Sequence, residues 1–289
     1  MGRRRDLAGL RVLVTGASQG IGRALAIDSA KRGMRVLASA RSADLLATLA
    51  DEARALPAVA SFETVVADTT SPAGRAAMVA AARAAFGGLD VLINNAGIGA
   101  TGHFMDSQPE ILRQIFETNV FGTTETTRAF LPMLKEGKTP AIVNISSVFG
   151  RRAFPARSLY SASKFAIQGW SEAIRAELDK DGIDVVVVNP GLTQTNFSKN
   201  MLEQKAKVQM DHLRGMTSEE VATRTLDALR KGKHEVTFTA KGKMLLLFAR
   251  FLPGVIDFFA KKKVRKLFAD EIAERTKLRE EKPLTTAGA

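Results

Sequence analysis

Tyr160 and Lys164 are the pair of residues in this sequence with the clearest chemical potential. Their spacing of four places both side chains on one face of a helix. A tyrosine hydroxyl ordinarily has a pKa near ~10, which is too high for efficient proton exchange at neutral pH. A neighbouring ammonium group stabilises the phenolate and lowers that pKa. We therefore predict that Tyr160 is a general acid and base and that Lys164 activates it, although a lone tyrosine is more often a packing residue.

A glycine-rich segment near the N-terminus follows one apolar run and precedes a helical stretch. Gly16 permits a tight turn, Gly20 lets the backbone approach a phosphate, and Gly22 lets the helix pack closely on the strand. Backbone N–H groups at the helix N-terminus then face a pyrophosphate. The residues of this turn that we expect to bind a dinucleotide are Gly16, Ser18, Gln19, Gly20, Ile21 and Gly22.

Short apolar or β-branched runs alternate with helical segments along the chain, which predicts an α/β fold with a parallel, doubly wound sheet. The run Val185 to Val188 is apolar at every position, as expected for a strand covered by helices on both faces. In such sheets ligands bind beyond the carboxyl ends of the strands. The expected strands are 11–15, 34–39, 62–67, 91–93, 141–145, 183–188 and 236–239, and the expected helices are 21–31, 43–56, 75–86, 110–134 and 162–180.

The chain is expected to form one catalytic domain at residues 7–239 and a C-terminal helical extension at 240–289. Within the extension, an apolar stretch at 244–259 precedes a basic cluster at 261–266. The stretch is too short and too interrupted for a membrane span. Apolar surface beside lysines is typical of peripheral membrane contact through 244–266, and the alternative is packing on the domain or on a second subunit.

Composition excludes several classes of site. The chain has no cysteine, so disulfides and thiolate metal sites are excluded. His103, His212 and His234 lie far apart in sequence, and we predict no metal. The net charge of +12 is not accompanied by a nucleic-acid motif, and we predict no nucleic-acid partner. No apolar run of signal-peptide length follows the basic start, so the expected location is cytoplasmic, with membrane association left open.

Five motifs in the same order resemble the short-chain dehydrogenase/reductase family, over about residues 7–239. They are Thr15-Gly16-Ala17-Ser18-Gln19-Gly20-Ile21-Gly22, Asn94-Asn95-Ala96-Gly97, Asn119, Ser147 with Tyr160 and Lys164, and Pro190-Gly191. The resemblance implies a Rossmann-type, seven-stranded sheet flanked by helices. It also implies hydride transfer between a nicotinamide cofactor and a carbonyl or alcohol.

Several further residue roles follow from this resemblance. Ser147 would hydrogen-bond the substrate oxygen, Lys164 would bind the nicotinamide ribose, and Asn119 would hold a water molecule that passes protons to solvent. Asp68 would contact the adenine amino group, although it could instead cap the following helix. The cofactor contacts implied in this way are Asp68, Asn95, Ala96, Gly97, Tyr160, Lys164, Pro190, Gly191, Thr193 and Thr195.

The end of the second expected strand favours NADP over NAD. A carboxylate at this place would bind the adenosine ribose and repel a 2′-phosphate, but the sequence has Ala40 there. Arg41 can pair with a phosphate through its planar guanidinium group, and Ser42 can donate a hydrogen bond. Alternatively, Arg41 is simply an exposed residue at the start of the next helix.

The expected substrate is the carbonyl or secondary alcohol of an apolar, lipid-like molecule, because the residues expected around it are mostly apolar. Arg151, Arg152 and Arg157 lie nearby in sequence and could add an anion site. The competing functions are a non-catalytic dinucleotide sensor and a membrane-surface protein on the same fold. The resemblance also implies a substrate lid at about 195–217 and a homodimer or homotetramer formed through helices 110–134 and 162–180. The residues expected to line the substrate pocket are Ile98, Phe104, Phe149, Phe154, Leu192 and Phe197.

Overall fold

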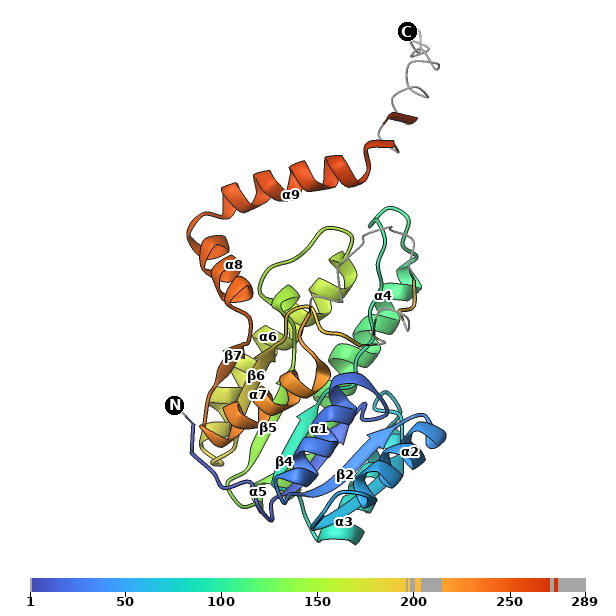
Figure 1. Cartoon of the computed structure of the whole chain (residues 1–289), viewed down its shortest axis with the longest axis vertical. Helices are drawn as coiled ribbons and strands as arrows, with labels where there is room; N and C mark the ends of the chain where they lie inside the picture. The colour runs from blue at the N-terminus through green and yellow to red at the C-terminus, as the bar shows by residue number, and fades with distance from the viewer. Residues whose placement is uncertain (1, 196, 198–200, 204–214, 271–272, 275–289) are drawn as a thin grey trace. The chain divides into compact units, whose positions relative to one another are not determined.

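A parallel sheet forms the centre of the computed structural model, which describes residues 2–195, 197, 201–203, 215–270 and 273–274. Within these residues the sheet has seven strands in the order β3-β2-β1-β4-β5-β6-β7 (Figure 1). The predicted Rossmann-type fold is therefore confirmed. The strands are β1 Arg11–Thr15, β2 Arg35–Ala40, β3 Ser61–Val66, β4 Val91–Asn94, β5 Ala141–Ile145, β6 Asp184–Asn189 and β7 Glu235–Thr237.

Helices cover both faces of the sheet because the buried side chains of its central strands alternate between two apolar clusters. In β1, Val12 and Val14 pack with Leu25 of α1 in one cluster, whereas Leu13 packs with Phe130 of α5 in the other. The helices of this domain are α1 Gly20–Lys31, α2 Ala43–Arg54, α3 Pro72–Phe86, α4 Pro109–Phe116, α5 Gly122–Lys135, α6 Ser158–Asp179 and α7 Ser218–Arg230.

The helix expected at 110–134 contains a π-helical turn, Glu117–Phe121, between α4 and α5. A π turn inserts an extra residue into the helix and commonly marks a functional site. Asn119 lies at the middle of this turn and is buried. The turn therefore sets the position of a residue for which the sequence predicts a catalytic role.

The first residues of the chain pack at the amino ends of β5, β6 and β7. The Arg5 side chain is buried and forms an ion pair with Asp184, the first residue of β6. It also donates hydrogen bonds to the carbonyl oxygens of Thr139 at 3.2 Å and Leu229 at 2.8 Å. Gly2 donates its backbone N–H to the carbonyl oxygen of Gly232 at 2.9 Å. The opposite, carboxyl ends of the strands are left open for a ligand.

The chain divides into two compact units, Met1–Met244 and Leu245–Ala289. The extension forms the helices α8 Ala240–Phe251 and α9 Pro253–Leu267. Among the described helices, none is long and apolar enough to cross a membrane. The expected boundary at residue 239 stays a prediction, as does the lid at 195–217, most of which lies outside the described residues.

Candidate active site

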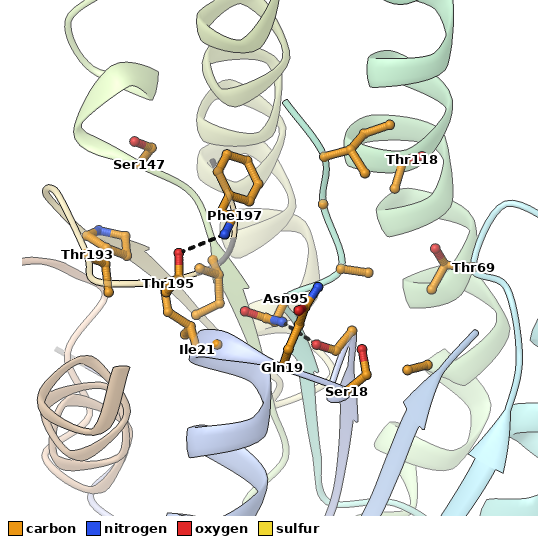
Figure 2. A pocket seen from close by; sticks show the side chains of 18 of the residues that line it. Ser18, Gln19, Ile21, Thr69, Asn95, Thr118, Ser147, Thr193, Thr195 and Phe197 are labelled. Carbon is orange, nitrogen blue, oxygen red and sulfur yellow. Dashed lines mark hydrogen bonds between the residues drawn. The ribbon is translucent and has the colours of Figure 1, made fainter. Parts of the chain in front are cut away.

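A cavity of about 650 Å³ opens where the strands of the catalytic domain end (Figure 2). It extends from the glycine-rich turn after β1 to the residues around Tyr160. Two of the expected site residues, Gly22 and Asn119, are not part of its lining. The expected residues that do line it are Gly16, Ser18, Gln19, Gly20, Ile21, Arg41, Ser42, Asp68, Asn95, Ala96, Gly97, Ser147, Tyr160, Lys164, Pro190, Gly191, Thr193 and Thr195.

The glycine-rich turn is held against the loop after β4 by contacts that exclude larger side chains. Gly16 and Gly20 have φ angles of 63° and 57°, in the left-handed region that favours glycine. A Cβ atom on Gly22 would lie 2.2 Å from the carbonyl oxygen of Gly16. The first turn of α1 can therefore approach β1 closely, and its backbone N–H groups reach the cavity.

Asn95 and Thr15 join this turn to the end of β4. The Asn95 amide donates to the carbonyl oxygens of Thr15 and Gly16, each at 3.1 Å. The Thr15 hydroxyl accepts hydrogen bonds from the backbone N–H groups of Asn95 and Ala96 at 3.1 and 3.2 Å. Thr15 belongs to the glycine-rich motif, in which the sequence alone assigns it no role, and these contacts make it a positioning residue.

Arg41 and Asp68 face each other at the end of the cavity nearest β2 and β3, with 3.9 Å between the guanidinium nitrogen and the carboxylate oxygen. The Arg41 side chain is 69% exposed. Asp68 also accepts a hydrogen bond from the Thr70 N–H at 2.9 Å. The helix that follows is capped by Ser71, whose hydroxyl accepts from the Gly74 N–H at 3.3 Å, so the alternative in which Asp68 caps α3 is wrong.

Lys164 lies one helical turn after Tyr160 on α6 and is buried. Its ammonium group donates to the carbonyl oxygen of Ile145 at 2.9 Å and lies 5.7 Å from the centre of the Tyr160 ring. Burial lowers the pKa of Lys164 to about 8. The Lys164 ammonium group thus donates one hydrogen bond to a carbonyl oxygen and borders the cavity, where a ligand could accept others.

The pKa of the Tyr160 hydroxyl is raised, whereas the sequence predicts that it is lowered. Burial raises the pKa of Tyr160 to about 12, although a hydrogen bond with Ser147 and the charge of Arg157 both lower it. Lys164 is not among the groups that lower this pKa. Burial therefore outweighs both of these effects, and the predicted activation of Tyr160 by Lys164 together with a bound nicotinamide stays a prediction.

Ser147 and Asn119 each have a defined structural environment. Ser147 precedes the short 3₁₀ helix η2 Val148–Gly150, and its hydroxyl accepts from the Phe149 N–H at 3.1 Å. The Asn119 amide donates to the Ile98 carbonyl oxygen and to the Ser163 hydroxyl, both at 2.9 Å. Asn119 also accepts from the Ile98 N–H at 2.8 Å. It therefore fixes the loop after β4 against α6, and its role in holding a water molecule stays a prediction.

Aromatic and apolar side chains form the wall beside Tyr160. The centre of its ring lies 5.6 Å from the ring centre of Phe197 and 6.4 Å from that of Phe149. Of the six residues expected here, Phe154 does not line the cavity but stacks on Phe149 at 5.6 Å. Phe104 is 74% exposed and also lies outside the lining. The expected residues that line the cavity are Ile98, Phe149, Leu192 and Phe197. Met201, which falls within the range expected for the substrate lid, lines it as well.

A family model described as short chain dehydrogenase matches residues 11–206 of this chain, which includes the turn, the Tyr160 region and most of the sheet. The chain belongs to the short-chain dehydrogenase/reductase family. This family is one of oxidoreductases, and the predicted resemblance is confirmed.

Relatives of this short-chain dehydrogenase/reductase cover most of its length. Dehydrogenase/reductase SDR family member 7B of Bos taurus is 34% identical over 264 residues, which are 88% of this chain and 81% of the bovine protein. A short chain dehydrogenase from Burkholderia cenocepacia J2315, in complex with NADP, is 28% identical with a TM-score of 0.74, over 89% of this chain and 99% of that one.

A third similar protein is the 3-ketoacyl-(acyl-carrier-protein) reductase from Brucella melitensis, complexed with NADH. It is 27% identical with a TM-score of 0.71, and the match covers 80% of this chain and 98% of the other. One of these similar structures thus contains NADP and the other contains NADH. This similarity does not distinguish NADP from NAD for the present member of the family.

We predict that Lys164→Met stabilises the protein at pH 7, because methionine fills a similar space without a charge that burial disfavours. The pKa of Lys164 is about 8 in the fold, against 10.5 for an unburied lysine, so the unfolded chain binds this proton more tightly. Wild-type stability should therefore rise as the pH increases from 8 to 10.5, through the interval between the two values. Urea unfolding should show a gain of about 1–3 kcal/mol at pH 7 that shrinks toward high pH.

The matched control for this prediction is Lys261→Met, since the Lys261 side chain is exposed on α9. This variant should change the free energy of unfolding little and without dependence on pH. A Lys164→Met protein that is less stable than wild type at pH 7 would show that the buried ammonium group stabilises the fold instead.

Proposed function

We propose that this protein is an NADP(H)-dependent oxidoreductase that interconverts a carbonyl and a secondary alcohol, with Tyr160 as the general acid and base. One observation carries the proposal: Tyr160, Ser147 and the buried Lys164 line the same cavity as the glycine-rich turn. A phenol, a hydroxyl and an ammonium group in one cavity are the groups that carbonyl reduction needs.

The residues of this cavity fit a nicotinamide dinucleotide. A Cβ atom on Gly16 would lie 2.8 Å from the Cα atom of Ala96, so glycine lets the turn that precedes the N-terminus of α1 lie close against the loop after β4. This helix end is suited to a pyrophosphate because its N–H groups lack partners within the helix. The complexes of two similar proteins with NADP and NADH support the same assignment.

When bound, the nicotinamide supplies or accepts the hydride. Tyr160 donates its proton to the carbonyl oxygen during reduction and accepts the alcohol proton during oxidation. Ser147 hydrogen-bonds the same oxygen and holds it beside the phenol. Lys164 binds the ribose hydroxyls next to Tyr160, and its positive charge favours the phenolate once these groups are brought together. With a pKa of about 12, the phenol is protonated at neutral pH, which suits the role of proton donor.

The environment of Arg41 supports the preference for NADP. Its guanidinium group is largely exposed and lies 3.9 Å from the Asp68 carboxylate, so it is available to a 2′-phosphate at little cost in lost contacts. Ser42 caps α2 by accepting from the Leu45 N–H at 3.5 Å, and its own hydroxyl hydrogen stays available. Both residues line the cavity beside Ala40, whose side chain carries no carboxylate that would repel a phosphate.

Tyr160→Phe should lower kcat for carbonyl reduction by about 10²- to 10⁴-fold, because the proton donor is lost while the ring is kept. The dissociation constant of NADPH, measured by its fluorescence, should change less than threefold if the phenol takes part in the reaction and not in cofactor binding.

Ser147→Ala and Ser146→Ala form a matched pair, since the Ser146 hydroxyl instead donates to the Lys164 carbonyl oxygen at 3.3 Å. Only Ser147→Ala should reduce kcat strongly.

This experiment also separates an enzyme from a non-catalytic dinucleotide sensor. A sensor would bind NADPH with the wild-type affinity and show no carbonyl reduction above background in any of the four proteins. Retention of most of the wild-type rate by Tyr160→Phe would remove Tyr160 from the mechanism.

Arg41→Asp should weaken NADPH binding by about 10- to 100-fold and NADH binding much less, since it replaces a phosphate partner by a like charge. Fluorescence titration of each cofactor measures the two dissociation constants. Arg54→Asp is the matched control, because Arg54 is exposed at the other end of α2 and pairs only with Asp51 among the described residues. Equal weakening of both cofactors by Arg41→Asp would argue against NADP preference.

We also propose that the protein is a homodimer or homotetramer formed through α4–α5 and α6. Phe121 at the π turn and Phe165 on α6 are 54% and 44% exposed, which is unusual for aromatic side chains without a covering partner. These are the two helical segments for which the sequence predicts a subunit interface.

The C-terminal unit supports a proposal of peripheral membrane contact. Leu247, Phe251, Phe258 and Phe259 are between 57% and 69% exposed. The exposed basic side chains of Lys261, Lys262, Arg265 and Lys266 follow on α9. Apolar side chains beside basic ones match the interface of an anionic bilayer, where each lysine near the surface contributes about 1 kcal/mol.

The full-length protein should co-sediment with phosphatidylcholine vesicles that contain phosphatidylserine and much less with vesicles that lack it. Lys261→Glu combined with Lys262→Glu should weaken this binding by about tenfold or more. Lys31→Glu combined with Lys231→Glu makes the same charge change at exposed lysines of the catalytic domain and should have little effect. Equal sedimentation of all three proteins would exclude the membrane proposal.

A further inference from the structure

Arg157 is a buried cation in the cavity that the proposed mechanism does not use. It directly precedes α6, is 5% exposed, and lines the cavity together with Tyr160, Phe197 and Met201. Arginine is among the residues that are least often buried without an ionic partner. Its presence beside the acid and base group therefore needs a physical reason.

Arg5 provides a comparison within the same chain. It is also 5% exposed, but it pairs with Asp184 and donates to two carbonyl oxygens. Arg157 donates through one guanidinium nitrogen to the Sδ atom of Met201 at 3.1 Å. Its Nε atom is buried with no hydrogen-bond partner. Within the part of the chain that the structure describes, no carboxylate forms an ion pair with it.

A buried guanidinium group with a thioether as its partner is costly, because sulfur is a weak acceptor and the charge has lost its water. Burial accordingly lowers the pKa of Arg157. Tyr160 is the one group whose charge opposes this effect. Since burial raises the pKa of Tyr160 to about 12, however, the phenol is neutral at pH 7 and cannot act as a standing counter-ion.

The surroundings of Arg157 place it in the substrate part of the cavity. The neighbouring Ala156 accepts from the Gly102 N–H at 3.1 Å, and the Thr101 hydroxyl donates to the same Met201 sulfur at 3.2 Å. Leu202 donates to the Gly99 carbonyl oxygen at 2.9 Å. Three segments, 99–102, 156–157 and 201–202, thus meet at Arg157, beside the aromatic wall and apart from the glycine-rich turn.

We propose that Arg157 binds an anionic group of the substrate, a carboxylate or a phosphate, close to the carbonyl that Tyr160 protonates. This inference rests on the proposed oxidoreductase function and refines its substrate class from an apolar carbonyl to one with an anionic end. A guanidinium group can bind either oxyanion through two parallel N–H groups, and the buried Nε supplies one of them. The aromatic wall contacts the apolar remainder of the molecule.

The test uses two matched pairs of ketones, reduced with NADPH and followed by its absorbance. One pair is a 3-oxoalkanoate and its methyl ester, and the other is a hydroxyketone phosphate and the free hydroxyketone. Wild type should prefer at least one anion over its neutral partner by about tenfold or more in kcat/KM. The pair that shows the preference identifies carboxylate or phosphate as the bound group.

Arg157→Met should lower the ratio of kcat/KM between the preferred anion and its neutral partner by about tenfold or more, mainly through KM for the anion, because any effect on the pKa of Tyr160 is shared by both substrates. Arg157→Lys should recover part of the loss, because it restores the charge without the planar fork. Arg151→Met is the control, since Arg151 is a nearby cation that pairs with Glu172 and Glu235 and does not line the cavity. It should keep the wild-type preference.

Two outcomes would overturn the inference. One is a wild type that reduces the neutral ketones as well as the anions. The other is an equal fall for charged and neutral substrates in Arg157→Met, together with a shift of the pH profile for both, which would make Arg157 a positioning residue for the Tyr160 phenolate. If no ketone is reduced, the proposed function fails separately. Calorimetric binding of the two anions to wild type and to Arg157→Met then decides the role of Arg157.

Discussion

The whole site depends on one close contact between backbone segments, at the point where the strand order reverses between β1 and β4. Any side chain at Gly22 would collide with the Gly16 carbonyl oxygen and with the Asn95 amide. Because β1 and β4 are neighbours in the sheet, the loops that follow them meet, and Thr15 and Asn95 join them by hydrogen bonds. The residues after β5 then lie beside these loops through the pairing of β4 with β5. Sheet topology, rather than any single catalytic group, thus brings distant segments of the chain to one cavity.

The polar groups of the cavity are held in an environment that disfavours their charges. Lys164 and Arg157 are buried cations whose pKa values burial lowers, and Tyr160 is a phenol whose pKa burial raises. A rigid, apolar sheet makes this possible, since β4 and β5 are buried at every position. Under the proposed function, such groups would gain their partners when substrate and cofactor bind, which is where interactions are most useful for catalysis. Stability and function therefore conflict at these positions, and the conflict is itself a sign of an active site.

Most of the architecture could be predicted from the sequence because the strands are apolar and the helices amphipathic. The bounds of β1 and β5 agree with the expected ranges. In contrast, β7 has only three residues, at 235–237, where the expected strand is 236–239. The π turn at Glu117–Phe121 could not be predicted, since one inserted residue leaves the helical pattern of apolar residues almost unchanged. The pattern of apolar and polar residues also does not predict which individual side chains are buried. Phe104 is exposed although it is aromatic, and Arg157 is buried although it is charged, because three-dimensional contacts decide both.

The packing of the first residues has a practical consequence for handling the protein on surfaces. Arg5 and Gly2 are anchored at the amino ends of β5, β6 and β7, and the cavity opens at the carboxyl ends. Strands of five or six residues separate the two ends by roughly 17–20 Å. A tether attached beside Gly2 would hold the molecule with its opening directed away from the support. Immobilisation on an electrode or resin through that point should therefore leave the exchange of small molecules unobstructed.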